Sequence, residues 1–134
     1  EEIEINKAKY LLEKADALRI FGDFNNAVLT AKKSNEFNPN SGEFYMTLGN
    51  IYIAGANNCG NEFEQSTVYW IAVDQFSKAL VYESTLDQAR KSINTYSKYF
   101  PTKEECFFNG GLENGEIYTV QCWINTQTKV RTSD

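Results

Sequence analysis

The sequence contains no histidine and no long apolar segment. Histidine is the side chain that most often moves a proton near neutral pH, and it belongs to the Ser-His-Asp and Cys-His nucleophile arrangements. Its absence also removes imidazole from any metal site. We therefore expect neither catalysis nor a metal or other cofactor. Because no run of about eighteen apolar residues occurs, we expect no membrane span.

Clustered basic residues are missing as well. The formal net charge is −5, and the 13 Lys and Arg residues are spread from Lys7 to Arg131. Nucleic-acid binding needs clustered Lys and Arg that neutralise phosphates. An anionic membrane surface needs a similar basic patch. The charge pattern argues against both.

The cysteines are few, and none of them forms a CxxC pair. Cys59, Cys106 and Cys122 lie far apart in the sequence, so a zinc or thioredoxin-like motif has little support. Two interpretations remain open. The three thiols are free and partly buried as small hydrophobic side chains, or Cys106 and Cys122 form a disulfide across neighbouring strands. The disulfide would place the protein in an oxidising compartment.

The pattern of small and large apolar residues recurs along the chain. A shift of 34 residues pairs three positions of a first segment with three of a second: Leu11 with Tyr45, Ala15 with Gly49, and Leu18 with Tyr52. Small residues let two helices approach closely, and their larger neighbours fill the remaining space. Between the segments, Gly22 suits the end of a helix and Asn38 precedes Pro39, where a helix stops. The pattern predicts packed antiparallel helices.

These spacings resemble the tetratricopeptide repeat, a helix pair of about 34 residues. The motif Tyr45-x-x-Leu48-Gly49-x-x-Tyr52 carries the first-helix signature, and Ala27, Ala31, Ser34 and Pro39 match the second helix and its end. The resemblance implies a mainly α-helical superhelix of about five helices over residues 1–101. Its expected parts are one repeat over 8–41, a second over 42–84 with an inserted loop at 57–61, and an extra helix over 85–101.

Aromatic residues are frequent, at 14% of the chain. Most of them, including Tyr69, Tyr96 and Tyr99, fall at helical spacing and are expected to pack in the core. Glu104 and Glu105 follow Pro101, and they are expected to begin a helix or turn rather than form an acid–base pair.

The composition changes after Pro101, and residues 102–134 are expected to form a C-terminal β-hairpin cap. Residues 116–124 favour a strand, 125–126 a turn and 127–132 a return strand. In that strand, Tyr118, Val120, Cys122 and Ile124 would share an apolar face that packs on the last helix. Trp123 would lie on the opposite face, as either an exposed contact residue or a cap on the helices.

The same tail carries a second resemblance. The segments Tyr96-Ser97-Lys98-Tyr99-Phe100-Pro101, Gly115-x-x-Tyr118-x-Val120 with Trp123-Ile124, and Thr128-x-Val130-Arg131 are similar to the C-terminal part of tetratricopeptide-type proteins of Bacteroides-like bacteria. That resemblance brings no assigned activity. It implies a location in the bacterial cell envelope, and we expect the chain to be a piece of a longer protein.

The tetratricopeptide resemblance implies a groove lined by the first helix of each pair, where a peptide or a partner helix binds. The positions carried over by spacing are Lys9, Leu12, Asp16, Arg19, Glu43, Met46, Asn50 and Ile53. Ordinary solvated helix residues would show the same pattern. Two functions therefore remain: a module that binds a partner through this groove or through Trp123, and the capped end of a longer solenoid with a structural role, including homo-oligomerisation.

Overall fold

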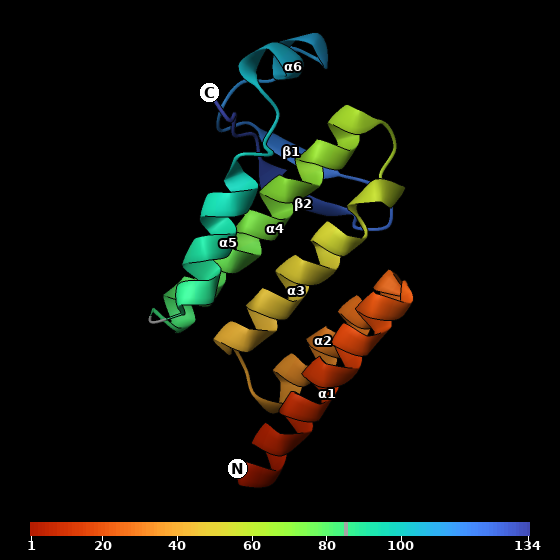
Figure 1. The fold of residues 1–134 in the computed structure, drawn as a ribbon, viewed down its shortest axis with the longest axis vertical. Coiled ribbons are helices and arrows are strands. Elements are labelled where there is room, and N and C mark those ends of the chain that lie inside the picture. Colours follow the sequence, from red (N-terminus) through yellow and green to blue (C-terminus); the bar gives the residue numbers. More distant parts are fainter. Residues whose placement is uncertain (85) are drawn as a thin grey trace.

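The computed structural model describes residues 1–84 and 86–134 and is mainly helical, with a small hairpin at its C-terminal end, as the sequence predicted (Figure 1). Thr85, the first residue of the expected last helix, lies outside the described residues. The elements in chain order are α1 (Glu2–Phe21), α2 (Phe24–Phe37), α3 (Gly42–Ala54), the 3₁₀ turn η1 (Ala56–Asn58), α4 (Glu62–Tyr82), α5 (Asp87–Ser97), α6 (Lys103–Phe108), β1 (Ile117–Val120) and β2 (Thr126–Lys129).

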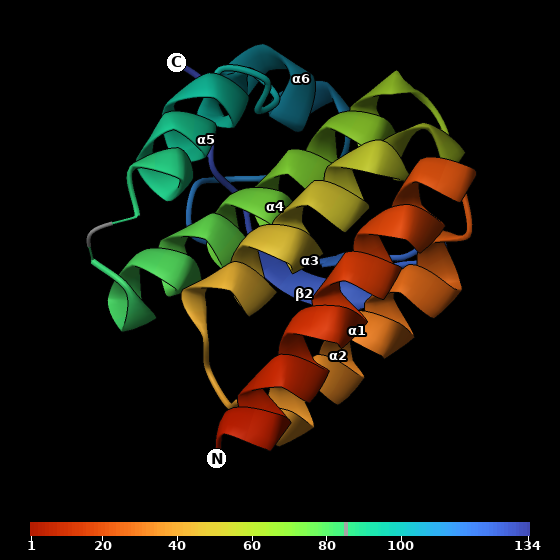
Figure 2. The same ribbon diagram turned by 60° about the horizontal axis from the view of Figure 1, so that its bottom comes forward.

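The helices are arranged in two layers. α1, α3 and α5 lie on the face turned toward the viewer in Figure 1, whereas α2 and α4 lie behind them. The hairpin lies on the far side of α4, as the rotated view in Figure 2 shows. The N-terminus of α1 and the C-terminal end of the chain are at opposite ends of the molecule.

Short-range capping explains where these helices begin and end. Gly22 ends α1 with φ +93°, a conformation that costs glycine little. Asp23 then caps α2, because its side chain accepts a hydrogen bond from the backbone N–H of Asn26. Asn61 and Glu64 form a reciprocal capping box at the start of α4. This box explains why the helix begins at Glu62, directly after the predicted loop.

The described chain contains one helix more than the five expected. α6 is a short helix at Lys103–Phe108, where the sequence indicated only the start of a helix or turn. Thr102 and Glu105 form a second capping box there, with backbone-to-side-chain distances of 3.1 Å and 2.9 Å. The sequence motif was therefore present, but the segment is too short for a helical period to be recognised.

The core depends on close contacts at small residues. Ala15, Ala27 and Ala31 are completely buried between α1 and α2. Gly49 of α3 lies against the ring of Phe76 from α4, and a Cβ at this position would run into that ring. The pattern of small residues in the sequence therefore does mark points where helices approach closely.

The two strands are shorter than predicted. β1 pairs antiparallel with β2, with Tyr118 opposite Thr128, but it ends at Val120. Cys122 and Asn125 have φ values of +41° and +44°, which an extended strand does not allow. Ile124 therefore belongs to the turn. The expected strand over 116–124 and return strand over 127–132 were wrong in extent.

Polar contacts attach the hairpin to α4. Arg131 forms an ion pair with Asp74 at 2.9 Å, and the Thr128 hydroxyl donates to the same carboxylate at 2.5 Å. The indole N–H of Trp70 donates to the backbone oxygen of Arg131 at 2.6 Å. The Arg131 guanidinium also lies 5.3 Å from the ring centre of Phe100. Together these contacts hold the tail in one place on the helices.

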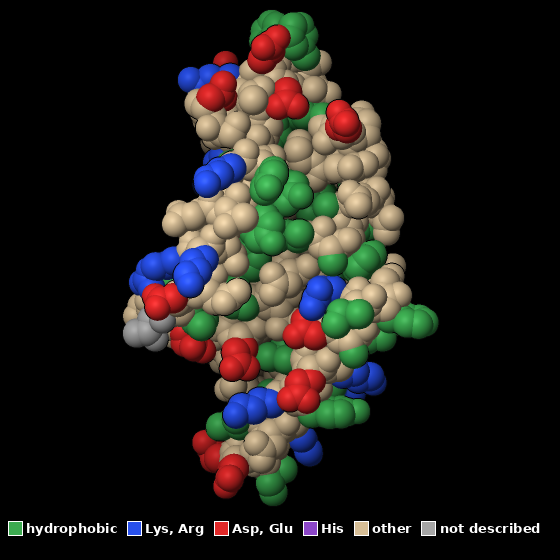
Figure 3. Space-filling view, viewed as in Figure 1, with side chains coloured by type: hydrophobic (Ala, Val, Ile, Leu, Met, Phe, Trp, Pro, Cys, Tyr) green, Lys and Arg blue, Asp and Glu red, His purple; other side chains and the backbone are tan. Residues whose placement is uncertain are grey.

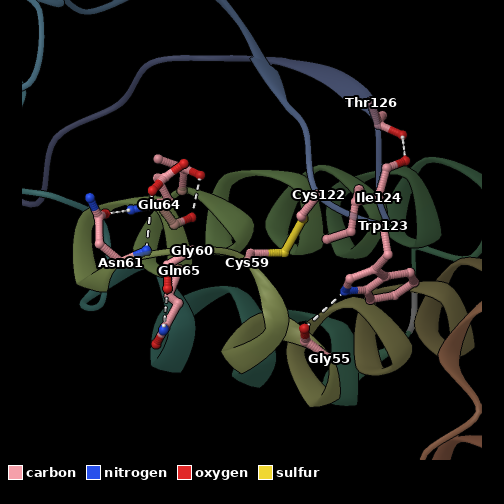
Figure 4. Close-up of a disulfide and its surroundings, with 11 residues drawn as sticks. Gly55, Cys59, Gly60, Asn61, Glu64, Gln65, Cys122, Trp123, Ile124 and Thr126 are labelled. Carbon is pink, nitrogen blue, oxygen red and sulfur yellow. Dashed lines mark hydrogen bonds between the residues drawn. A yellow bond between two sulfur atoms is a disulfide. The ribbon is translucent and has the colours of Figure 1, made fainter.

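A disulfide joins Cys59 to Cys122 (Figure 4). Both interpretations of the cysteines were therefore wrong, the three free thiols as well as the pair of Cys106 and Cys122. Cys106 does not lie on a strand next to Cys122. It belongs to α6, where it is a buried free thiol. Cys122 lies in the turn of the hairpin, which reaches the loop between η1 and α4 that contains Cys59. The bond therefore links the hairpin turn to the middle of the chain.

Candidate functional site

A hollow of about 430 Å³ lies between α1 and α3. Its lining includes five of the residues carried over by the repeat spacing: Lys9, Leu12, Asp16, Glu43 and Met46. Leu12 and Met46 are buried and supply apolar surface, whereas Lys9 and Glu43 are exposed. The hollow therefore combines an apolar base with side chains of both charges.

The other three residues carried over by spacing do not line this hollow. Arg19 donates from Nε to Asp16 at 3.4 Å, so its side chain turns back along α1. Asn50 and Ile53 are half-buried further along α3, on the same helix face as Met46. Ile53 packs against the core cluster that contains Phe76. The predicted positions on α3 therefore form one continuous strip, and the hollow occupies only one end of it.

Two lining residues were missed at the sequence level. Glu13 and Thr47 also line the hollow. Each follows a predicted residue by four positions, since Glu13 follows Lys9 and Thr47 follows Glu43. Residues four apart on a helix are neighbours on its surface, so this spacing was the signal that could have identified them.

Trp123 lies on the other side of the molecule and packs against helices. Its indole N–H donates to the backbone oxygen of Gly55 at 2.9 Å, as Figure 4 shows. Its ring stacks on Phe24 at 5.6 Å and lies 5.8 Å from Tyr52. These contacts agree with the interpretation of Trp123 as a cap, although part of the side chain stays accessible beside Lys32.

A group of three tyrosines forms a second feature of the face that carries α3 and α5. Tyr69 of α4 stacks on Tyr96 of α5 at 5.9 Å and lies 5.3 Å from Tyr99, just after α5. We call Tyr69, Tyr96 and Tyr99 the tyrosine cluster. The sequence assigned all three to the core, but Tyr99 is exposed and the other two are only partly buried. Tyr99 lies just before Pro101, where the helix has ended and helical spacing no longer predicts burial.

The described residues contain no group of three His, Cys, Asp or Glu side chains placed to hold a metal ion. Within residues 1–84 and 86–134, no helix has the length and apolar character needed to cross a bilayer. Comparisons with protein-family models, with curated proteins and with solved structures found no match to this chain. The candidate site therefore has to be judged on its own geometry.

Proposed function

We propose that this protein is a non-catalytic interaction module that holds a segment of a partner protein along the face formed by α1 and α3. The observation that carries the proposal is the hollow between these helices. Residues chosen only by repeat spacing, Lys9 and Asp16 on α1 and Glu43 and Met46 on α3, come together around it. The tetratricopeptide resemblance supports the same face, because in that family the first helix of each pair lines the groove.

The chemistry of the hollow supports a peptide-like partner. Leu12 and Met46 form the floor of the hollow, and the small exposed part of each side chain is the apolar surface that a side chain of the partner would contact. Lys9 and Glu43 stand at the exposed edge, where charges affect specificity and association rate more than affinity. The arrangement is that of a small apolar centre with a charged rim, which is typical of protein interfaces.

A charge reversal at the rim tests the proposal. We expect Lys9→Glu to reduce partner capture severalfold, measured by chemical cross-linking in an extract of the source cells and mass spectrometry. Lys33→Glu is the matched control, because Lys33 is an exposed lysine on α2, away from the hollow. Equal capture by the wild type, the Lys9 variant and the control would contradict a binding role for this face.

The disulfide supports a location outside the reducing cytosol. Disulfides form and persist in oxidising compartments, and the Cys59–Cys122 bond joins two distant parts of this chain. We therefore propose that the module works in an oxidising compartment, in line with the envelope location that the resemblance of the tail implies.

The outer face of α1 favours a second candidate, a structural role in assembly. Tyr10 is 64% exposed and Phe21 87% exposed on this helix. Shifted by 34 residues, Tyr10 corresponds to Phe44 and Ala17 to Ile51, which are only 5% and 0% exposed on α3. In α3 these positions are covered by the preceding helix pair. The same positions on α1 are thus suited to contact another helix pair or a second copy.

Sedimentation analysis over a range of concentrations tests this assembly role. We expect the wild-type chain to self-associate at high micromolar concentration and the double variant Tyr10→Lys with Phe21→Lys to remain monomeric, because charge on the face prevents its burial. Lys9→Glu should leave this association unchanged, which separates the assembly role from binding at the hollow. A wild-type chain that stays monomeric throughout would contradict self-assembly through α1.

A further inference from the structure

The outer edge of α1 carries an apolar stripe. Ile3, Tyr10, Ala17 and Phe21 fall on one face of this helix by their spacing, and all four are exposed. We call these four residues the α1 stripe. Figure 3 shows hydrophobic and basic side chains alternating along the lower right edge of the molecule, where α1 lies in front of α2. The edge is therefore an apolar surface with positive charge beside it.

Two lysines supply that charge. Lys7 and Lys14 are exposed, and each lies three or four residues from Tyr10, so both are neighbours of the stripe on the helix surface. The ion pairs formed within the described residues involve other charges. Glu13 lies on the opposite flank, where it lines the hollow toward α3. The edge turned away from α3 is thus basic, although the whole chain has a formal charge of −5.

The short helix α6 carries an apolar tip of the opposite charge. Phe107 and Phe108 are 68% and 73% exposed, and their rings meet edge to face at 5.5 Å. We call these two residues the α6 tip. Figure 3 shows hydrophobic side chains at this upper end of the molecule with acidic ones next to them. The acidic residues on or beside α6 outnumber its lysine, Lys103, and they are Glu104, Glu105, Glu113 and Asp134.

A hollow of about 470 Å³ lies beside the α6 tip. Phe107, Leu112 and Glu113 are among the residues that line it. Hollows with an apolar lining receive large side chains that protrude from a partner. Tyr10 and Phe21 protrude in this way from the α1 stripe, since they are 64% and 87% exposed. The two ends of the molecule therefore match in apolar character and in shape as well as in charge.

We propose that copies of this chain associate head to tail, with the α6 tip of one copy packed on the α1 stripe of the next. Charge complementarity argues for a second copy as the occupant, because the acidic residues beside the tip meet the lysines beside the stripe. The inference rests on the assembly role proposed above and names the surface that covers α1. The start of α1 and the α6 tip lie at opposite ends of the molecule (Figure 1), so each contact leaves a stripe and a tip free for further copies.

The same charges oppose the symmetric alternatives. Two α1 stripes packed on each other would bring Lys7 and Lys14 of both copies to one interface. Two α6 tips would do the same with Glu104 and its acidic neighbours. Like charges brought together disfavour association, so the contact between unlike ends is preferred.

Mixing two variants, each with one defective end, tests the inference by analytical ultracentrifugation. The head variant is Tyr10→Lys with Phe21→Lys, and the tail variant is Phe107→Ser with Phe108→Ser. We expect each variant alone to associate at least about tenfold more weakly than the wild type. Their equimolar mixture should form a one-to-one heterodimer and nothing larger, because only the tip of the head variant and the stripe of the tail variant remain intact.

Val81→Ser is the matched control. Val81 is 77% exposed on α4, away from the α1 stripe and the α6 tip, so this variant should associate like the wild type. All the replaced side chains are exposed, so the circular-dichroism spectra of the variants should match that of the wild type.

Two outcomes would overturn the inference: a tail variant that associates as strongly as the wild type, or a mixture of head and tail variants that stays monomeric. The first outcome would leave the assembly role of α1 standing with a different occupant. A wild-type chain that stays monomeric would reject both the inference and the assembly role. Binding at the hollow between α1 and α3 is tested separately by Lys9→Glu, and none of these outcomes affects it.

Discussion

Gly49 sets how closely α3 and α4 can pack. The ring of Phe76 occupies the space that any side chain at this position would need. Glycine in a helix normally costs about 1 kcal/mol relative to alanine because of its backbone freedom. Here the close contact offsets that cost, and it explains why a poor helix former stands in the middle of a buried helix.

We therefore expect Gly49→Ala to lower the free energy of unfolding by about 1–3 kcal/mol, because overpacking at Phe76 exceeds the gain in helix propensity. Urea denaturation followed by circular dichroism measures the change. Ser77→Ala, at an exposed position of α4, is the control and should change stability by less than about 0.5 kcal/mol. A Gly49 variant as stable as the wild type would mean that Phe76 moves aside without loss.

Cys106 is chemically protected despite being a free thiol. Burial raises its pKa, and the nearby negative charges of Glu105 and Asp134 raise it further. Because the thiolate is the reactive form, this thiol should react slowly at neutral pH.

Alkylation with iodoacetamide tests both the low reactivity of the Cys106 thiol and the pairing of Cys59 with Cys122. In the folded, unreduced protein we expect slow labelling, and in denaturant one fast-labelled cysteine, Cys106. Mass spectrometry of the unreduced digest should contain a peptide pair linked through Cys59 and Cys122. A linked pair through Cys106 would contradict the structure.

Among the elements, the helices were easier to predict than the hairpin. The helical segments carry their own periodic pattern, and the close contacts at Ala15 and Gly49 follow directly from the recurrence of small residues. The turn between β1 and β2 depends on positive φ angles at Cys122 and Asn125. Asparagine is enriched in this conformation and was placed in the predicted turn, whereas cysteine gives no such signal. Helix spacing identified five residues that line the hollow, three on α1 and two on α3. It did not show that Arg19, Asn50 and Ile53 lie outside the hollow, because that depends on how the two helices pack.

The disulfide pairing could not be derived from the sequence. Three cysteines allow three pairings, and the choice depends on which loop the hairpin turn reaches. That placement comes from contacts such as Trp123 with Gly55 and Arg131 with Asp74, which join residues distant in the chain.

The attachment of β2 to α4 depends on Asp74. Its carboxylate binds both the Arg131 guanidinium and the Thr128 hydroxyl, and it is only partly exposed. Removing it takes away the acceptor of the Thr128 hydroxyl and the countercharge of Arg131, which keeps its hydrogen bonds to the backbone oxygens of Trp70 and Lys129.

We expect Asp74→Ala to lower the free energy of unfolding by about 1–3 kcal/mol, measured by urea denaturation. Asp87→Ala is the matched control, because Asp87 also pairs with an arginine, Arg90, but is almost fully exposed. Its effect should stay below about 1 kcal/mol, because the exposed pair contributes little and the remaining term is the charge of Asp87 in the first turn of α5. Equal effects of the two substitutions would show that the Asp74 contacts do not hold the hairpin.

For the whole molecule, the disulfide connects parts that are 63 residues apart in sequence. Closing a long loop removes conformational freedom from the unfolded chain, which stabilises the folded state by about 2–4 kcal/mol. The Trp123 contacts lie beside the bond, so the same region is held by both covalent and packing interactions.

Replacing both bonded cysteines, Cys59→Ser with Cys122→Ser, should lower the melting temperature by roughly 10 °C. Differential scanning calorimetry measures the shift, and reduction of the wild-type protein should reproduce it. The control is Cys106→Ala, which leaves the bond intact and should respond to reductant as the wild type does. If the double variant had the same melting temperature as the oxidised wild type, the bond would not stabilise the fold.

The bond between Cys59 and Cys122 also turns part of the chain into a covalent ring that contains α4, α5 and α6. A protease that cuts within this ring, for example in the glycine-rich loop at Gly110, leaves both fragments attached to each other. Such nicking becomes visible on a gel only after reduction. A cut at Gly22 lies outside the ring, so on a denaturing gel α1 separates from the rest of the chain without any reductant.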